Sequence, residues 1–355
     1  MGKLEDTIKR IGPLNEGAMA AARARQDTLT KPLGSLGRLE ELSIQLAGIT
    51  GQARPLIRHK AIIVMAGDHG VVAEGVSAYP QEVTPQMVYN FLRGGAGINV
   101  LARHAGSRVV VVDMGVACEL EPHQALVNRK VAPGTRNMAL GPAMTRGEAR
   151  QAVEAGIEVL EAEATKGLDI VGTGDMGIGN TTASSAITAA FTGCPVEVIT
   201  GRGTGLNDEQ LQRKIEVIRR ALDVNRPDPA DPLGVLAGVG GFEIGGLAGV
   251  ILGAAANHIP VVVDGFISGA AALVACGLCS QAREYLIPAH RSVEVGHRAI
   301  FEHLALKPRL DLDLRLGEGP GAAIGGFIVE AAARVLSEMA TFGEAGVAEA
   351  LPEGG

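Results

Sequence analysis

Short, uninterrupted hydrophobic runs alternate with longer stretches of mixed polarity through most of the chain. A run such as 109–113 shows no alternation of polar and apolar side chains, which is typical of a strand buried on both faces of a parallel sheet. The longer stretches repeat apolar residues every three or four positions, as amphipathic helices do. We therefore predict an α/β fold with a doubly wound, mostly parallel sheet. The predicted strands are 61–66, 109–113, 169–172, 196–200, 235–239 and 260–264.

The two ends of the chain have a different pattern, because helical periodicity continues there without strand-like runs. The last long periodic segment, 322–339, predicts a helix rich in small apolar residues. We predict a small helical domain formed by residues 1–50 with 322–345, a large α/β domain over 51–321, and a frayed tail over 346–355.

Composition narrows the classes of function. The net charge of −7, the absence of tryptophan and an aromatic content of only 3% leave the chain without the basic stripe and stacking rings of nucleic-acid-binding proteins. The N-terminus lacks the charged-then-apolar pattern of a signal peptide. Polar residues such as Asn257 and Asp264 interrupt the apolar stretch 244–279, which argues against a membrane span. We therefore expect a cytoplasmic protein that acts on small molecules, with neither nucleic acid nor membrane as partner.

Two glycine-rich loops are the first candidate binding elements. Residues 172–182 and 201–205 each follow a predicted strand and precede a predicted helix. Backbone N–H groups in such loops can hold a phosphate, although glycine also serves tight turns alone. The first loop also has the dinucleotide-binding spacing G-x-G-x-x-G, but Glu197, 20 residues beyond Gly177, falls inside a predicted strand instead of at its end. We therefore favour a nucleotide phosphate over a dinucleotide.

Further segments carry side chains that suit a ligand. Asp68 and His69 end a predicted strand, where they could form a catalytic pair or half of a metal site. No other ligand stands at metal-binding spacing, so we expect no metal. The turn 77–80 combines hydroxyl groups with a flat ring and suits a heteroaromatic ligand. Residues 288–294 place a histidine, an arginine and a serine in one loop, which suits an anion.

The segment 314–321 contains the most informative carboxylate. Glu318 stands between Gly317 and Gly319, just before the predicted C-terminal helix. The flanking glycines permit a sharp turn and the close approach of a ligand. A carboxylate in this position either caps the helix or acts as a general base. We favour the base, because the other polar and glycine-rich segments also follow predicted strands and would gather at the same end of the sheet.

Taken together, these motifs resemble the nicotinate-nucleotide–dimethylbenzimidazole phosphoribosyltransferase family of cobalamin biosynthesis. The matching segments cover nearly the whole chain and are 31–40, 67–71, 75–80, 172–182, 241–244, 263–266 and 315–319. The resemblance implies a Rossmann-like sheet, a small helical domain built from both chain ends, and a homodimer. It also implies transfer of the 5-phosphoribosyl group from nicotinate mononucleotide to 5,6-dimethylbenzimidazole with inversion, giving α-ribazole 5′-phosphate and nicotinate without a metal or cofactor.

The resemblance further implies roles for individual residues. Glu318 matches the catalytic base, and Asp175 and Lys214 are secondary candidates near the ribose phosphate. Some relatives carry a glutamate at the position of Asp175. The implied substrate-binding residues are Ser77, Tyr79, Pro80, Gln86, Met176 and Leu316 for the benzimidazole, Gly174, Gly177, Ile178, Gly179, Asn180 and Gly203 for the phosphate, Asp264 for the ribose, and His290 and Ser292 from the same or the partner subunit.

Three other functions stay open at this point. A nucleotide N-glycosidase would use water in place of the benzimidazole, and a non-catalytic binding or sensor protein would hold the nucleotide without turnover. A dehydrogenase would bind NAD and transfer a hydride.

Overall fold

The computed structural model describes residues 2–203 and 205–348, and it divides into two compact units. The larger unit contains the residues up to Gly12 together with His59–Gly326, and the smaller unit contains Pro13–Arg58 and the residues from Phe327 onward. The predicted frayed tail falls outside the described residues from position 349.

A six-stranded sheet with the order β3-β2-β1-β4-β5-β6 forms the centre of the larger unit, and every pairing in it is parallel. All eight residues of β1 are buried, as expected for a strand covered on both faces. The order confirms the predicted doubly wound, Rossmann-like fold. The strands are β1 (Lys60–Gly67), β2 (Ser107–Gly115), β3 (Leu126–Asn128), β4 (Ile170–Met176), β5 (Val261–Val263) and β6 (Leu286–Pro288), with β7 (His290–Arg291) and β8 (Leu310–Asp311) in a second, two-stranded sheet.

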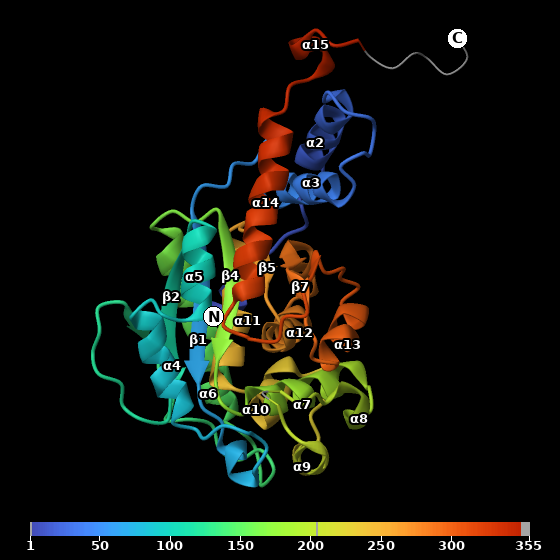
Figure 1. The fold of residues 1–355 in the computed structure, drawn as a ribbon. Helices are drawn as coiled ribbons and strands as arrows, with labels where there is room; N and C mark the ends of the chain where they lie inside the picture. Colours follow the sequence, from blue (N-terminus) through green and yellow to red (C-terminus); the bar gives the residue numbers. More distant parts are fainter. Residues whose placement is uncertain (1, 204, 349–355) are drawn as a thin grey trace. The chain divides into compact units, whose positions relative to one another are not determined.

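Helices cover the sheet (Figure 1). The helix α4 (Val83–Leu92) packs on β1 and β2, and α5 (Gly97–His104) packs on β2. The helix α11 (Phe242–Ala256) packs on the central strands and against α6 (Arg146–Ala164). The α6–α11 contact is unusually close, because a Cβ atom on Gly249 would lie 2.9 Å from the carbonyl carbon of Val153. The other helices of this unit are α1 (Lys3–Arg10), α7 (Asn180–Thr192), α8 (Val196–Ile199), α9 (Asp208–Asn225), α10 (Pro232–Val239), α12 (Phe266–Leu278) and α13 (Gly296–His303), with 3₁₀ turns at Gly70–Glu74 and Ser280–Tyr285.

Two strand predictions are wrong. The run 196–200 lies in the short helix α8, which follows Pro195, and the run 235–239 lies in α10, which begins at Pro232. An apolar run of five residues does not distinguish a buried strand from a buried helix, and α10 is apolar on every side. The glycine loop 201–205 therefore follows a helix, and Glu197, placed in a strand by the sequence analysis, is helical. The short strands β3 and β6 were not predicted.

The smaller unit is helical. It contains α2 (Glu16–Thr28), α3 (Arg38–Thr50), the later part of α14 (Pro320–Glu338) and α15 (Phe342–Ala345). Residues from both ends of the chain form its core, since Ala22 and Ala47 pack with Leu336. Arg25 donates hydrogen bonds to the carbonyl oxygens of Leu336 (2.7 Å) and Met339 (3.1 Å), which satisfies the end of α14.

The first helix, α1, belongs to the larger unit instead of the helical one. The backbone N–H of Leu4 donates to the Glu154 carboxylate of α6 (3.2 Å), and Lys3 forms an ion pair with Glu161 of the same helix (3.1 Å). Among the described helices, none has the length and hydropathy required to span a bilayer.

Candidate functional site

The site lies where the strand order reverses, between β1 and β4. In doubly wound sheets the loops after two such strands diverge and leave a crevice for ligands. Asp68 and His69 follow β1, and the loop 177–179 joins β4 to α7. The two loops touch, because a Cβ atom on Gly177 would lie only 3.4 Å from the carbonyl carbon of Gly67 and closer still to its oxygen. Glycine is therefore required at this position.

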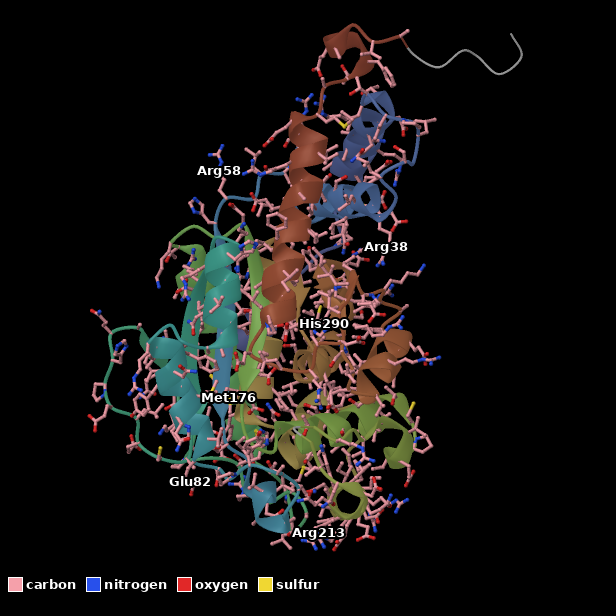
Figure 2. The ribbon with its side chains drawn as sticks, in the orientation of Figure 1. Arg38, Arg58, Glu82, Met176, Arg213 and His290 are labelled. Atoms are coloured by element: carbon pink, nitrogen blue, oxygen red, sulfur yellow. The ribbon has the colours of Figure 1, made fainter. Side chains whose placement is uncertain are left out.

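A cavity of about 110 Å³ opens beside the end of β4. Met176 and His290, two of its lining residues, are labelled in Figure 2. The predicted site residues that line it are Asp175, Met176, Gly177, Ile178, Asn180, Gly203, His290, Ser292 and Leu316. Residues from distant parts of the sequence thus line one cavity, in line with the expectation that these segments gather at the same end of the sheet.

A second, smaller cavity of about 40 Å³ contains Lys214, and both cavities are lined by Thr181 and Gly203. It also includes the predicted residues Ser77, Gly177, Ile178, Gly179 and Asn180. Lys214 is only 1% exposed, and its ammonium group donates to the Thr181 hydroxyl (2.8 Å) and to the Gly201 carbonyl oxygen (3.3 Å). Burial lowers the pKa of Lys214 to about 8. The α7 helix begins at this cavity, and although the Asn180 and Thr182 N–H groups donate to the Gly177 and Gly179 carbonyl oxygens, the positive end of the helix and the Lys214 ammonium group suit an anion.

Glu318 occupies a strained turn next to Leu316 and Gly317, which line the first cavity, although Glu318 itself lines neither cavity. Gly317, Glu318 and Gly319 all have left-handed backbone conformations, with φ values of 76°, 64° and 105°. The Glu318 N–H donates to the Asp175 carbonyl oxygen (3.1 Å), which ties the turn to the end of β4. A non-glycine residue with positive φ is uncommon and costs free energy, so the surrounding contacts must hold it.

The carboxylate of Glu318 is buried and reaches the start of α5. Its Oε2 accepts a hydrogen bond from the N–H of Ile98 (3.3 Å). Burial raises the pKa of Glu318, and the hydrogen bond from Ile98 opposes that change. The N-terminus of α14 is served by another residue, because the Ala322 N–H donates to Asp264 Oδ1 (2.9 Å). Glu318 therefore does not cap its own helix. Its buried carboxylate has the environment expected of a general base.

Two buried aspartates flank this turn. Asp175 accepts a hydrogen bond from the Asn180 side chain (2.9 Å), and burial, together with the negative charges of Glu243 and Glu318, raises the pKa of Asp175 to about 7. Burial also raises the pKa of Asp264 well above its ordinary value. One oxygen of each aspartate has no hydrogen-bond partner within the described part of the chain. These oxygens are available to a ligand or to a proton.

His290 lines the larger cavity, and the buried ring of His297 lies near it, with the two ring centroids 6.2 Å apart. His290 Nε2 lies 4.0 Å from Asp264 Oδ1, and burial lowers the pKa of His290. His297 accepts the Ser292 N–H at Nδ1 (3.1 Å), and burial lowers its pKa to about 3. Both rings are therefore neutral near pH 7 and can serve as hydrogen-bond partners without adding charge.

A buried ion pair that the sequence analysis did not identify supports the two loops. His69 Nε2 lies 2.8 Å from Glu243 Oε1, and both side chains are almost completely buried. Burial alone would lower the pKa of His69, but the charge and hydrogen bond of Glu243 raise it overall. The two residues are 174 positions apart. The segment 241–244 was noted only as a family motif, so no signal paired it with His69.

Some predicted site residues lie away from the cavities. Tyr79, which is 51% exposed, Pro80 and Gln86 are on the surface and line neither cavity. Gly174 and Asp264 line neither cavity: Gly174 packs against the turn at Glu318, and Asp264 accepts the Ala322 N–H at the start of α14. The cavity also contains Glu294 and Arg315, which the sequence analysis did not assign to the site. Within residues 2–203 and 205–348, no group of three His, Cys, Asp or Glu side chains is placed to hold a metal ion.

Comparison with known proteins gives a consistent result. A family model described as Phosphoribosyltransferase matches residues 11–347. Proteins named nicotinate-nucleotide–dimethylbenzimidazole phosphoribosyltransferase from Roseiflexus sp. (strain RS-1) and Desulforudis audaxviator (strain MP104C) are 63% and 62% identical, covering 98% and 99% of this chain and the same shares of theirs. The crystal structure of CobT from Thermus thermophilus matches with a TM-score of 0.91 and 50% identity, covering 94% of this chain and 100% of that chain. The chain therefore belongs to the nicotinate-nucleotide–dimethylbenzimidazole phosphoribosyltransferase family.

Proposed function

We propose that this protein transfers the 5-phosphoribosyl group from nicotinate mononucleotide to 5,6-dimethylbenzimidazole, giving α-ribazole 5′-phosphate and nicotinate for the nucleotide loop of cobalamin. One observation carries the proposal: the buried carboxylate of Glu318 is held in a left-handed turn between two glycines, directly against the end of β4. A raised pKa makes this carboxylate a better proton acceptor than an exposed one.

The smaller cavity is the proposed place of the 5′-phosphate. The ammonium group of Lys214, the loop 177–179 and the first turn of α7 all face it. Ammonium groups and free backbone N–H groups at a helix N-terminus are favourable partners for a phosphate. The ribose then extends into the larger cavity, where His290 and Ser292 are the proposed contacts; Asp264, which does not line the cavity but lies 4.0 Å from His290, is proposed to act on the ribose from beside them.

The chemistry explains why a base is needed. The bond between the pyridinium nitrogen and C1′ breaks, and its electron pair leaves with nicotinate, so the ring departs neutral. One benzimidazole nitrogen attacks C1′ from the opposite face, which inverts the configuration. The proton on the other benzimidazole nitrogen passes to Glu318. Asp175 and Asp264, when ionised, would stabilise the positive charge that develops on the ribose. The transfer exchanges no electrons with a cofactor.

The remaining assignments extend the same proposal. The proposed benzimidazole slot contains Ser77, Tyr79, Pro80, Gln86, Met176 and Leu316. Met176 and Leu316 line the larger cavity, whereas Ser77 lines the smaller one and would have to reach the base from there. Tyr79, Pro80 and Gln86 would have to approach the cavity when the base binds, or face it from a second copy of the chain in a homodimer. We place the protein in the cytoplasm, as a biosynthetic enzyme that acts on small molecules.

A chromatographic assay tests the proposal. Wild-type protein is incubated with nicotinate mononucleotide, with and without dimethylbenzimidazole, and nicotinate and α-ribazole phosphate are measured. We expect both products only when the benzimidazole is present. Nicotinate release without it would identify an N-glycosidase, and binding without release would identify a non-catalytic protein.

Glu318→Gln tests the role of the base. We expect turnover to fall by about 10²–10⁴-fold, while the dissociation constant for nicotinate mononucleotide changes little, because the amide keeps the shape of the side chain but cannot take the proton. The control is Glu302→Gln, since Glu302 is exposed and paired with Arg298 on α13. Wild-type turnover in Glu318→Gln would remove the assignment.

A further inference from the structure

Glu294 lines the larger cavity, yet the mechanism above does not use it. It lies in the loop between β7 and α13, where its N–H donates to the Ser292 hydroxyl (3.3 Å) and its carbonyl oxygen accepts the His297 N–H (3.0 Å). The backbone of this residue is therefore fixed. Its Oε2 is buried and has no hydrogen-bond partner among the described residues. A buried carboxylate oxygen without a partner requires an explanation.

The side chain of Glu294 reaches the glycine loop that separates the two cavities. A Cβ atom on Gly201 would lie 3.0 Å from the Glu294 carboxyl carbon, so the carboxylate rests directly on this glycine. Lys214 approaches the same loop from the other cavity: its Nζ lies 3.3 Å from the Gly201 carbonyl oxygen and 3.6 Å from the Cβ position of Gly203. Glu294 and Lys214 thus face each other across one short loop.

The two groups also influence each other's charge. Burial raises the pKa of Glu294, and the charge of Lys214, a hydrogen bond from the Gly203 backbone and the charge of Arg315 all oppose that rise. The charge of Glu294 likewise opposes the effect of burial on the pKa of Lys214. Each group favours the charged form of the other. The partners of the Glu294 carboxylate are those proposed for the substrate phosphate.

We propose that Glu294 is the internal counter-anion of the phosphate subsite: in the empty enzyme its carboxylate takes the Gly203 N–H and neutralises Lys214, and it yields these partners when a phosphate binds. The inference rests on the proposed function for the identity of the phosphate subsite. A buried ammonium group without a counter-charge is costly, so the carboxylate keeps Lys214 protonated and in place. Two anions cannot share the same donors without strong repulsion, so the carboxylate also weakens phosphate binding.

Calorimetric titration of the whole protein with inorganic phosphate at pH 6.5 tests the inference. We expect Glu294→Gln to bind phosphate at least about tenfold more tightly than wild type, because the competing charge is gone. Glu294→Asp keeps the charge but is one methylene shorter, so it should also bind phosphate more tightly. Glu302→Gln, which removes an exposed charge from the adjacent helix, should match wild type. Thermal melting of each variant shows that it is folded.

Two results would overturn the inference. Unchanged or weaker phosphate binding by Glu294→Gln would mean that the carboxylate does not compete with phosphate. Tight binding by Glu294→Gln with wild-type binding by Glu294→Asp would mean that only long-range repulsion acts, without occupation of the subsite. The titration involves no turnover, so its outcome is separate from that of the nicotinate-release assay. Tighter binding by both variants in a protein that releases no nicotinate would refute the proposed function alone.

Discussion

The contact between Gly174 and the turn at Glu318 allows the role of the base to be tested without changing the base itself. Gly174 lies in β4, and its backbone does not have the left-handed conformation that excludes other residues. A Cβ atom there would lie 2.7 Å from the Glu318 carbonyl carbon and 3.1 Å from the Gly319 nitrogen. Gly174→Ala would therefore push directly on the backbone that holds the carboxylate.

The size of the effect follows from these distances. Ordinary van der Waals contact begins at 3.4 Å, and the Glu318 carbonyl oxygen lies closer to the Cβ position than the carbonyl carbon does, so the turn must retreat by more than 0.7 Å, on the order of 1 Å. A misplacement of about 1 Å at a catalytic group costs on the order of 10²-fold in rate. We expect kcat/KM to fall by about 10²-fold. Overpacking of this kind also lowers the free energy of unfolding by about 1–3 kcal/mol.

The assay is nicotinate release at pH 7.5 in a double-mutant cycle of Gly174→Ala and Glu318→Gln, with urea unfolding of each variant. If Gly174→Ala acts by moving the base, it should cost little further activity once the base is absent. Gly141→Ala is the matched control, because a Cβ at that glycine meets no atom within 4 Å. Equal loss of activity in both backgrounds would refute the reasoning, as would wild-type activity in Gly174→Ala alone.

Three further predictions concern charge and packing. Asp175 has its pKa raised from 3.8 to about 7, so its contribution to stability is present at low pH and is lost as the pH rises toward and through 7. Asp175→Asn should therefore have a higher free energy of unfolding than wild type at pH 8, by on the order of 4 kcal/mol, and nearly the same free energy of unfolding at pH 4, both measured by urea unfolding. Lys214 loses its proton above a pKa of about 8, so the affinity for nicotinate mononucleotide, titrated from pH 6.5 to 9.5, should fall through pH 8 in wild type and not in Lys214→Gln. Gly249→Ala should lower the free energy of unfolding by about 2 kcal/mol or more, because its Cβ would lie 2.9 Å from the Val153 carbonyl carbon; stability equal to wild type would mean that α6 and α11 separate freely.

The fold was predictable where hydrophobic runs were long enough to have one interpretation. The runs 61–66, 109–113, 169–172 and 260–264 correspond to β1, β2, β4 and β5. The run 235–239 failed because a helix buried on every side has no polar face, and so its composition is that of a buried strand. Strands of three residues, such as β3, are held by neighbouring strands, and their own sequence carries little signal.

The residues of the candidate site were easier to predict from the sequence than the contacts between them. Glycines around Asp175 and Glu318 are visible in sequence because each marks a turn or a close approach, and the structure brings both segments together through the hydrogen bond from Glu318 N–H to the Asp175 carbonyl oxygen. The ion pair of His69 with Glu243, and the approach of Glu294 to Gly201, join residues that are far apart in the chain. Such pairings depend on the packing of whole elements, so motif spacing does not reveal them.

The buried groups of the site also determine its thermodynamics. Asp175 and Lys214 have pKa values of about 7 and 8, so near neutrality neither is completely in one protonation state. A phosphate bound at the proposed subsite beside Lys214, with its ribose in the cavity that Asp175 lines, would change both equilibria, so we expect substrate binding to take up or release protons. The heat of binding then contains the ionisation enthalpy of whatever buffer supplies or accepts those protons. Titrations in buffers that differ only in ionisation enthalpy would give the number of protons exchanged on binding. That number is a calorimetric measure of how the buried groups of this site change their protonation.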